Sequence, residues 1–144
     1  MEWVALITWV ITAGGGFVML GLWLQNSGMK QSDMPGDRIR PPRILSHFGL
    51  AATGLVVWII YLATDSEALA WIAFALLAIV ALLGFSMLAI WLRQRSRQPA
   101  TAGPASEAGA AEQRFPPPIV ALHGVLAAAT LVLVFLVAVG VGGS

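Results

Sequence analysis

The two histidines of the chain, His47 and His123, stand in matching sequence contexts and are the residues best suited to carry chemistry. Each one follows a Pro-Pro pair by five residues and precedes a Leu-Ala-Ala segment. The segments Pro41–Ala52 and Pro117–Ala128 therefore correspond position by position. Two imidazoles that enter equivalent helices at the same depth are the donor set of a bis-histidine haem, which takes one axial ligand from each side.

The residues around both histidines also suit a flat cofactor. Small side chains recur four and seven positions after each histidine, on the same helical face, where they would leave room for a porphyrin: Ala51, Gly54, Ala127 and Thr130. Aromatic and methionine side chains at a similar depth are expected at the porphyrin edges: Phe17, Phe48, Phe85, Met19 and Met87. Arginines near the helix ends are candidate partners for the propionates, because Arg–carboxylate pairs are strong in good geometry: Arg40, Arg43, Arg93 and Arg114.

Other roles of the two histidines stay open at this point. A histidine in a membrane helix also forms hydrogen bonds between helices, relays protons or binds a transition metal. A dedicated zinc or copper site uses three or four ligands, and neither cysteine nor carboxylate accompanies the pair in the apolar runs. The lack of cysteine also excludes disulfides, thiolate ligation and covalent c-type haem attachment.

Composition places the chain in a membrane. Of its 144 residues, 58% are hydrophobic and 10% are charged, whereas a soluble domain carries about 25% charged residues; the mean hydropathy is +0.83. Four runs without acid, lysine or arginine are long enough to cross a bilayer, which takes about 20 residues: roughly Trp3–Leu24, Ile44–Thr64, Ala68–Leu92 and Ile119–Val141. The first run lacks a basic n-region, so we do not expect a cleaved signal peptide. We predict one all-α domain over residues 1–144, an up-down four-helix transmembrane bundle.

The basic residues set the expected orientation. All eight lie in two loops, residues 25–43 and 93–118, and none lies at either terminus or in the Asp65–Glu67 turn. The positive-inside rule puts both loops on the cytoplasmic side of the cytoplasmic membrane and both termini outside. Residues 98–111 are rich in Pro, Ala, Gly and Ser, and we expect them to form a flexible linker.

A second repeat supports the one at the histidines. The motif Gly-Phe-x-Met-Leu-x-x-Trp-Leu occurs at Gly16–Leu24 and again at Gly84–Leu92. Together the repeats predict a duplicated two-helix hairpin, with repeat 1 over residues 1–64 and repeat 2 over residues 68–144. Both copies would share one membrane orientation, as in a parallel repeat about the membrane normal. The two histidines would then lie at one depth on diagonal helices, near the central axis.

A compact bundle with His47 and His123 on alternate helices resembles the b-type membrane cytochromes, loosely the cytochrome b561 type. The resemblance covers the bundle and rests on these two residues. It implies a haem b cofactor and electron transfer. The chain departs from those families in one respect, because they usually carry a second histidine pair towards the opposite face and this sequence has none. Electron transfer across the whole membrane is therefore not implied for this chain alone.

We predict a membrane electron-transfer protein that holds one bis-histidine haem b near the cytoplasmic side. It would be an electron carrier or an oxidoreductase subunit rather than a stand-alone enzyme, since the redox chemistry belongs to the cofactor. Besides lipid and haem, the candidate partners are quinone, other membrane redox subunits and a second copy of the chain, but not nucleic acid. One alternative is a cofactor-free structural or assembly subunit in which the histidines fix helix register. A small transporter or channel is less favoured, because ion paths usually need charged residues in the helices.

Overall fold

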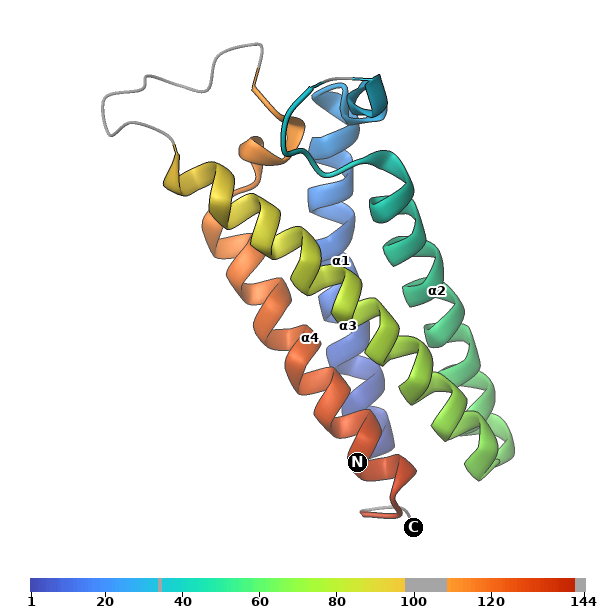
Figure 1. The fold of residues 1–144 in the computed structure, drawn as a ribbon. Coiled ribbons are helices and arrows are strands. Elements are labelled where there is room, and N and C mark those ends of the chain that lie inside the picture. Colours follow the sequence, from blue (N-terminus) through green and yellow to red (C-terminus); the bar gives the residue numbers. More distant parts are fainter. Residues whose placement is uncertain (34, 98–108, 142–144) are drawn as a thin grey trace.

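The computed structural model describes residues 1–33, 35–97 and 109–141. Four long helices in these ranges form an up-down bundle (Figure 1): α1 Glu2–Gln25, α2 Pro41–Thr64, α3 Glu67–Ser96 and α4 Pro117–Ala138. Two short 3-10 helices lie in the long connections: η1 Gly28–Asp33 and η2 Ala111–Arg114. Both long connections lie at one end of the bundle, here called the loop end, while the N-terminus and the end of α4 lie at the other. The predicted all-α four-helix fold is confirmed.

All four helices are long and apolar enough to cross a membrane. Large apolar side chains also cover their outward faces: Ile7, Leu82 and Val125, for example, are 57%, 69% and 68% exposed. A helix that is apolar on its outward face as well as its inward face belongs in lipid or in a large core. The chain is therefore a multi-pass membrane protein.

Proline begins two of the helices. Pro41 and Pro42 open α2, and Pro117 and Pro118 open α4. In the first turn of a helix the backbone N–H has no partner within the helix, so proline loses nothing there and its fixed φ suits the turn. These prolines set the depth of both histidines, because each imidazole follows its Pro-Pro pair by the same number of residues.

Residues with a left-handed backbone conformation terminate α2 and α4. Asp65, with φ of 50°, ends α2, and its N–H donates to the Tyr61 carbonyl at 2.8 Å. Gly140, with φ of 82°, follows α4. The N–H groups of Gly140 and Val141 donate to carbonyls in the last helical turn, at 2.9 and 2.8 Å, which is the usual glycine termination of a helix. This turn ends α4 at Ala138, before the predicted end of the span at Val141.

The helices associate as two antiparallel pairs, α2 with α3 and α1 with α4. Contacts between α3 and α4 join the pairs along one side, and α1 and α2 meet less extensively on the other. The order around the bundle is therefore α1, α4, α3, α2. This order puts α2 and α4, which carry the histidines, at diagonal positions, as the sequence predicted.

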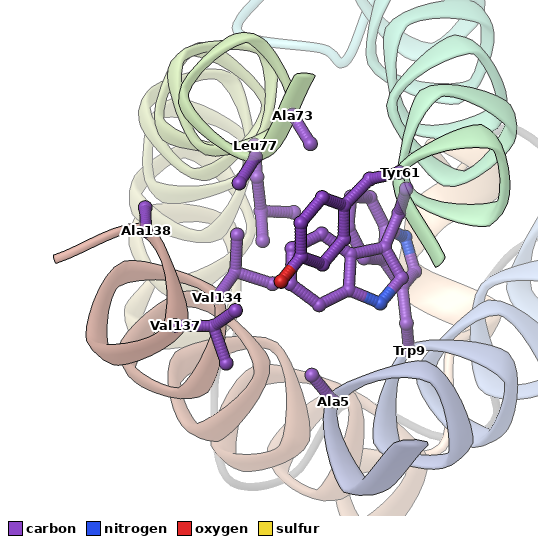
Figure 2. Packing of buried hydrophobic residues seen from close by; sticks show 10 residues of the cluster. Ala5, Trp9, Tyr61, Ala73, Leu77, Val134, Val137 and Ala138 are labelled. Atoms are coloured by element: carbon purple, nitrogen blue, oxygen red, sulfur yellow. The ribbon is translucent and has the colours of Figure 1, made fainter. Parts of the chain in front are cut away.

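The interior contains two apolar clusters, with the histidines between them. The first cluster contains Trp9, Trp58 and Tyr61 and lies in the half of the bundle away from the loop end. Figure 2 shows Trp9 and Tyr61 packed among its smaller members. The Tyr61 hydroxyl also donates to Glu2 at 2.6 Å, which ties α2 to the start of α1. The second cluster lies at the loop end and contains Trp23 of α1, Trp91 of α3, and Ala111 and Phe115 of the second long connection.

The prediction of a flexible linker over residues 98–111 is wrong for its last two residues, Ala110 and Ala111. Residues 98–108 lie outside the described part of the chain. Ala110 and Ala111, however, are only 6% and 2% exposed, and Ala111 belongs to the second apolar cluster. This end of the connection is held by apolar packing and by the buried carboxylate of Glu112, whose hydrogen bonds are given below.

Candidate histidine site

The imidazoles of His47 and His123 meet across the diagonal of the bundle. Their ring centroids lie 6.3 Å apart and their planes are inclined by 53°. Both side chains are half-buried. The structure therefore brings together the two residues that the sequence singles out, from two helices that lie far apart along the chain.

Each imidazole is held by a backbone carbonyl of the helix paired with its own. His47 Nδ1 lies 3.0 Å from the carbonyl oxygen of Val80 on α3, and His123 Nδ1 lies 2.9 Å from that of Thr12 on α1. A carbonyl oxygen only accepts hydrogen bonds, so both Nδ1 atoms carry the proton and donate. Nε2 of each neutral ring is then left with its lone pair, and neither Nε2 has a hydrogen-bond partner among the described residues.

Two glycines make this approach to the backbone possible. A Cβ placed on Gly84 would lie 3.3 Å from Cε1 of His47, and one placed on Gly16 would lie 3.3 Å from Cε1 of His123. Gly84 and Gly16 each follow by one helical turn the residue whose carbonyl the histidine binds. Since the Cβ of a helical residue points back towards the preceding turn, a side chain at either position would stand beside that carbonyl. The glycines therefore provide the clearance that each imidazole needs.

The contacts of the two histidines correspond under the repeats found in the sequence. Gly16 and Gly84 begin the two copies of the Gly-Phe-x-Met-Leu motif, and Thr12 and Val80 each precede that glycine by one helical turn. Each histidine packs on the helix that begins the other predicted repeat. This correspondence is what a duplicated hairpin would produce, and the duplication itself stays a prediction.

The small residues beyond the histidines lie in two different surroundings. Ala51 and Ala127, one turn further along, are half-buried. Gly54 is buried, and a Cβ placed there would lie 3.1 Å from Cζ2 of Trp9. Thr130 is 1% exposed, and its hydroxyl donates to the Leu126 carbonyl at 2.8 Å. The sequence predicted free space for a porphyrin beside Gly54, but the Trp9 indole fills that space.

Aromatic residues at the histidine level lie towards the outside of the bundle. Phe17 and Phe48 meet edge to face with ring centroids 5.5 Å apart, and both are exposed. They lie between α1 and α2, the less extensively packed side, and Phe48 directly follows His47. Phe85 is exposed and Met87 half-buried, while Met19 packs against the second apolar cluster.

The candidate arginines all lie at the loop end and are exposed: Arg40, Arg43, Arg93 and Arg114. Arg43 precedes His47 by one helical turn, and Arg40 donates from Nη1 to the Ser32 carbonyl at 3.2 Å. Arg40 and Arg43 line a cleft that is described below.

A buried polar network at the loop end was not predicted. Glu112, which is 0% exposed, accepts hydrogen bonds from the backbone N–H of Ile39 at 2.8 Å and from the side-chain amides of Gln94 and Gln31 at 2.6 and 2.9 Å. Gln31 Oε1 in turn accepts from the backbone N–H of Ala111 at 2.9 Å. The network ties both long connections to the end of α3, and so fixes the loop that leads into His47.

Within the described residues, no group of three or more His, Cys, Asp and Glu side chains is placed to hold a metal ion. The histidine pair is therefore a two-donor set, which suits a group that brings its own equatorial ligands. The chain matches no known family model, no curated protein and no solved structure.

Proposed function

We propose that this chain holds one haem b between His47 and His123 and serves as a membrane electron carrier or as a subunit of a redox complex. The observation that carries the proposal is the common contact of the two imidazoles. Nδ1 of each lies within hydrogen-bond distance of a backbone carbonyl, and a neutral ring that donates there keeps the lone pair of Nε2 for a metal ion. Metal-ligating histidines are usually held in this way, because the second hydrogen bond fixes both the tautomer and the ring orientation.

The separation of the rings also supports the proposal. An imidazole nitrogen binds a metal ion at about 2 Å, so two imidazoles on opposite sides of one ion have centroids roughly 6 Å apart. The observed separation of 6.3 Å is of this size. When bound, haem would supply one-electron chemistry, and two axial histidines would leave no iron position open for oxygen.

The packing of the helices favours the side between α1 and α2 for the rest of a flat group. These two helices meet less extensively than α3 and α4 do. Phe17 and Phe48 stand at that side, next in sequence to Gly16 and His47, and would contact the edge of the group. The proposed surroundings of the haem also include two small residues one turn beyond the histidines, Ala51 and Ala127, and two methionines, Met19 and Met87. Arg43 and Arg114 are the candidate partners for the propionates.

The expected orientation places this site near the cytoplasmic face. All eight basic residues of the sequence lie in the two long connections, and the positive-inside rule then puts the loop end in the cytoplasm. Both histidines lie within two helical turns of the Pro-Pro pairs at that end. Quinone or another redox subunit would exchange electrons with the haem at this side of the membrane.

The same hydrogen bonds favour a second candidate function, a cofactor-free structural or assembly subunit. Interhelical hydrogen bonds in membrane proteins contribute on average about 0.6 kcal/mol each. The bonds from His47 to Val80 and from His123 to Thr12 join α2 to α3 and α1 to α4. In this reading the histidines fix the register of the two helix pairs and bind nothing else.

A reduced-minus-oxidised absorption spectrum of the protein, expressed with ample haem and purified, separates the two functions. The haem proposal expects a red protein with a Soret band and the spectrum of low-spin iron, at one haem per chain. A colourless protein that stays folded under these conditions would refute haem binding and favour the assembly subunit.

A further inference from the structure

A basic cleft of about 420 Å³ opens at the loop end, on the side where α2 and α3 meet. Its lining comes from the loop before α2, from the first turn of α2 and from Ile90 of α3. Three of the lining residues are basic, Arg38, Arg40 and Arg43, and one is acidic, Asp37. The cleft is therefore a concave surface with an excess of positive charge.

The loop that carries two of these arginines is anchored by buried groups. Ile39, between Arg38 and Arg40, is 2% exposed, and its N–H donates to the buried carboxylate of Glu112 at 2.8 Å. The Ile39 carbonyl accepts from Gln31 Nε2 at 3.2 Å, and Arg38 Nη1 donates to Oε1 of the same glutamine at 3.3 Å. The arginines on both sides of Ile39 are thus presented by a fixed backbone.

The donors in the cleft are side chains rather than the end of a helix. Pro41 and Pro42 have no N–H, and the N–H groups of Arg43 and Ile44 donate to the Arg40 carbonyl at 3.1 and 3.4 Å. The Arg43 guanidinium makes no hydrogen bond or ion pair with the described residues. Guanidinium groups present several N–H donors in a planar fork that matches the oxygens of a phosphate.

We propose that this cleft binds the phosphate of an anionic phospholipid headgroup. The cleft lies where α2 begins its apolar run and borders Ile90, which lies within the apolar run of α3. Exposed leucines on the same helices, Leu45 and Leu92, offer apolar surface to the acyl chains. A basic pocket at the cytoplasmic ends of membrane helices is the recurrent setting for such headgroups.

The test measures the lipid retained by the full-length protein. Protein is reconstituted in bilayers of phosphatidylglycerol or of phosphatidylcholine, and native mass spectrometry counts the lipids that stay bound after gentle release. We expect retention of phosphatidylglycerol over phosphatidylcholine. Arg40→Gln and Arg43→Gln should each weaken retention of phosphatidylglycerol roughly fivefold, because each removes a guanidinium that would hydrogen-bond the phosphate in the cleft.

Arg97→Gln is the matched control, because it removes the same charge at the loop end outside the cleft. It should leave retention unchanged, and circular dichroism should show equal helicity in all variants. Equal retention of both lipids, or an equal loss in Arg97→Gln, would overturn the proposal. Displacement of the lipid by millimolar inorganic phosphate would also overturn it, in favour of a soluble phosphate ligand.

The lipid proposal does not depend on the proposed haem. Arg43 is a candidate partner for a propionate as well, so Arg40→Gln is the more decisive variant. His47→Ala, which removes a proposed axial ligand, should retain phosphatidylglycerol as the unaltered protein does. Loss of the lipid in His47→Ala would show that the cleft depends on the histidine site, and would overturn the assignment of an independent lipid site.

Discussion

Gly16 and Gly84 occupy the same position relative to a histidine of another helix. A Cβ on Gly16 would lie 3.3 Å from Cε1 of His123, and a Cβ on Gly84 would lie 3.3 Å from Cε1 of His47. Such a contact is tighter than side chains normally make, so the imidazole would have to move. These two glycines thus connect a repeated motif in the sequence to the hydrogen bonds that orient the histidines.

Replacing Gly16 by leucine should push His123 away from the Thr12 carbonyl. Forcing extra carbon atoms into a packed position costs about 1–3 kcal/mol, and the free energy of unfolding should fall by that amount. Gly14→Leu is the matched control on the same helix, because nothing lies within 4 Å of a Cβ at that position. Reversible unfolding in mixed detergent measures both variants, and equal effects would show that Gly16 does not provide clearance for the histidine.

Replacing either histidine by alanine should abolish the low-spin haem spectrum. His47→Ala and His123→Ala each remove one of the two proposed axial ligands. The double variant should lose no more haem than either single variant, because residues that act as a unit are not additive. Ser46→Ala, at an exposed neighbouring position, should keep the spectrum. Membrane insertion should survive in all variants, since hydrophobicity and loop charge direct it.

Two outcomes of the histidine experiment would change the assignment. If only one histidine proves necessary for haem, a symmetric site is wrong and Met19 or Met87 becomes the candidate for the second ligand. If the unaltered protein binds no haem and the histidine variants change only stability, the cofactor-free reading is the better one. Arg43→Ala and Arg114→Ala should at most weaken haem retention or shift the reduction potential.

The orientation of the chain can be checked with reporters. A reporter fused after residue 144, or placed in the Asp65–Glu67 turn, should be found outside, and one inserted near residue 105 should be cytoplasmic. The physical reason is that all eight lysines and arginines lie in the two long connections. A cytoplasmic location of the C-terminus would contradict this orientation, and with it the proposed depth of the haem.

The four spans and the meeting of the histidines could be predicted because they depend on local features. Long apolar runs define the helices, and the Pro-Pro pairs before His47 and His123 set equal depths. The role of Gly16 could not be read from the sequence, since a glycine in a membrane helix usually serves close helix packing. Its contact with His123 follows only once α1 is known to pair with α4.

The surroundings of Gly54 and Glu112 could not be predicted from the sequence either, because they depend on side chains from distant parts of the chain. Helical spacing puts Gly54 on the face of His47, but a tryptophan from another helix fills the space beside it. Glu112 lies beside a Pro/Ala/Gly/Ser-rich segment, where an acid is normally solvated. Its burial depends on Gln31 and Gln94, which reach it from other parts of the chain.

The buried carboxylate of Glu112 should be necessary for the structure of the loop end. In Glu112→Ala, the backbone N–H of Ile39 and the amides of Gln31 and Gln94 lose the acceptor that they share. A buried donor without a partner costs about 1–3 kcal/mol, so the free energy of unfolding should fall by at least about 2 kcal/mol. Hydrogen exchange at the Ile39 amide should also become faster, because this N–H donates directly to the carboxylate.

Two further variants make the Glu112 prediction specific. Glu112→Gln keeps one acceptor oxygen in a side chain of similar size. Its free energy of unfolding should therefore lie between those of Glu112→Ala and the unaltered protein. Gln113→Ala, at a half-buried neighbouring position, should change stability by less than about 0.5 kcal/mol. If Gln113→Ala and Glu112→Ala prove equally harmful, a local disturbance of η2 would account for both, and the carboxylate would not be what joins the two connections to α3.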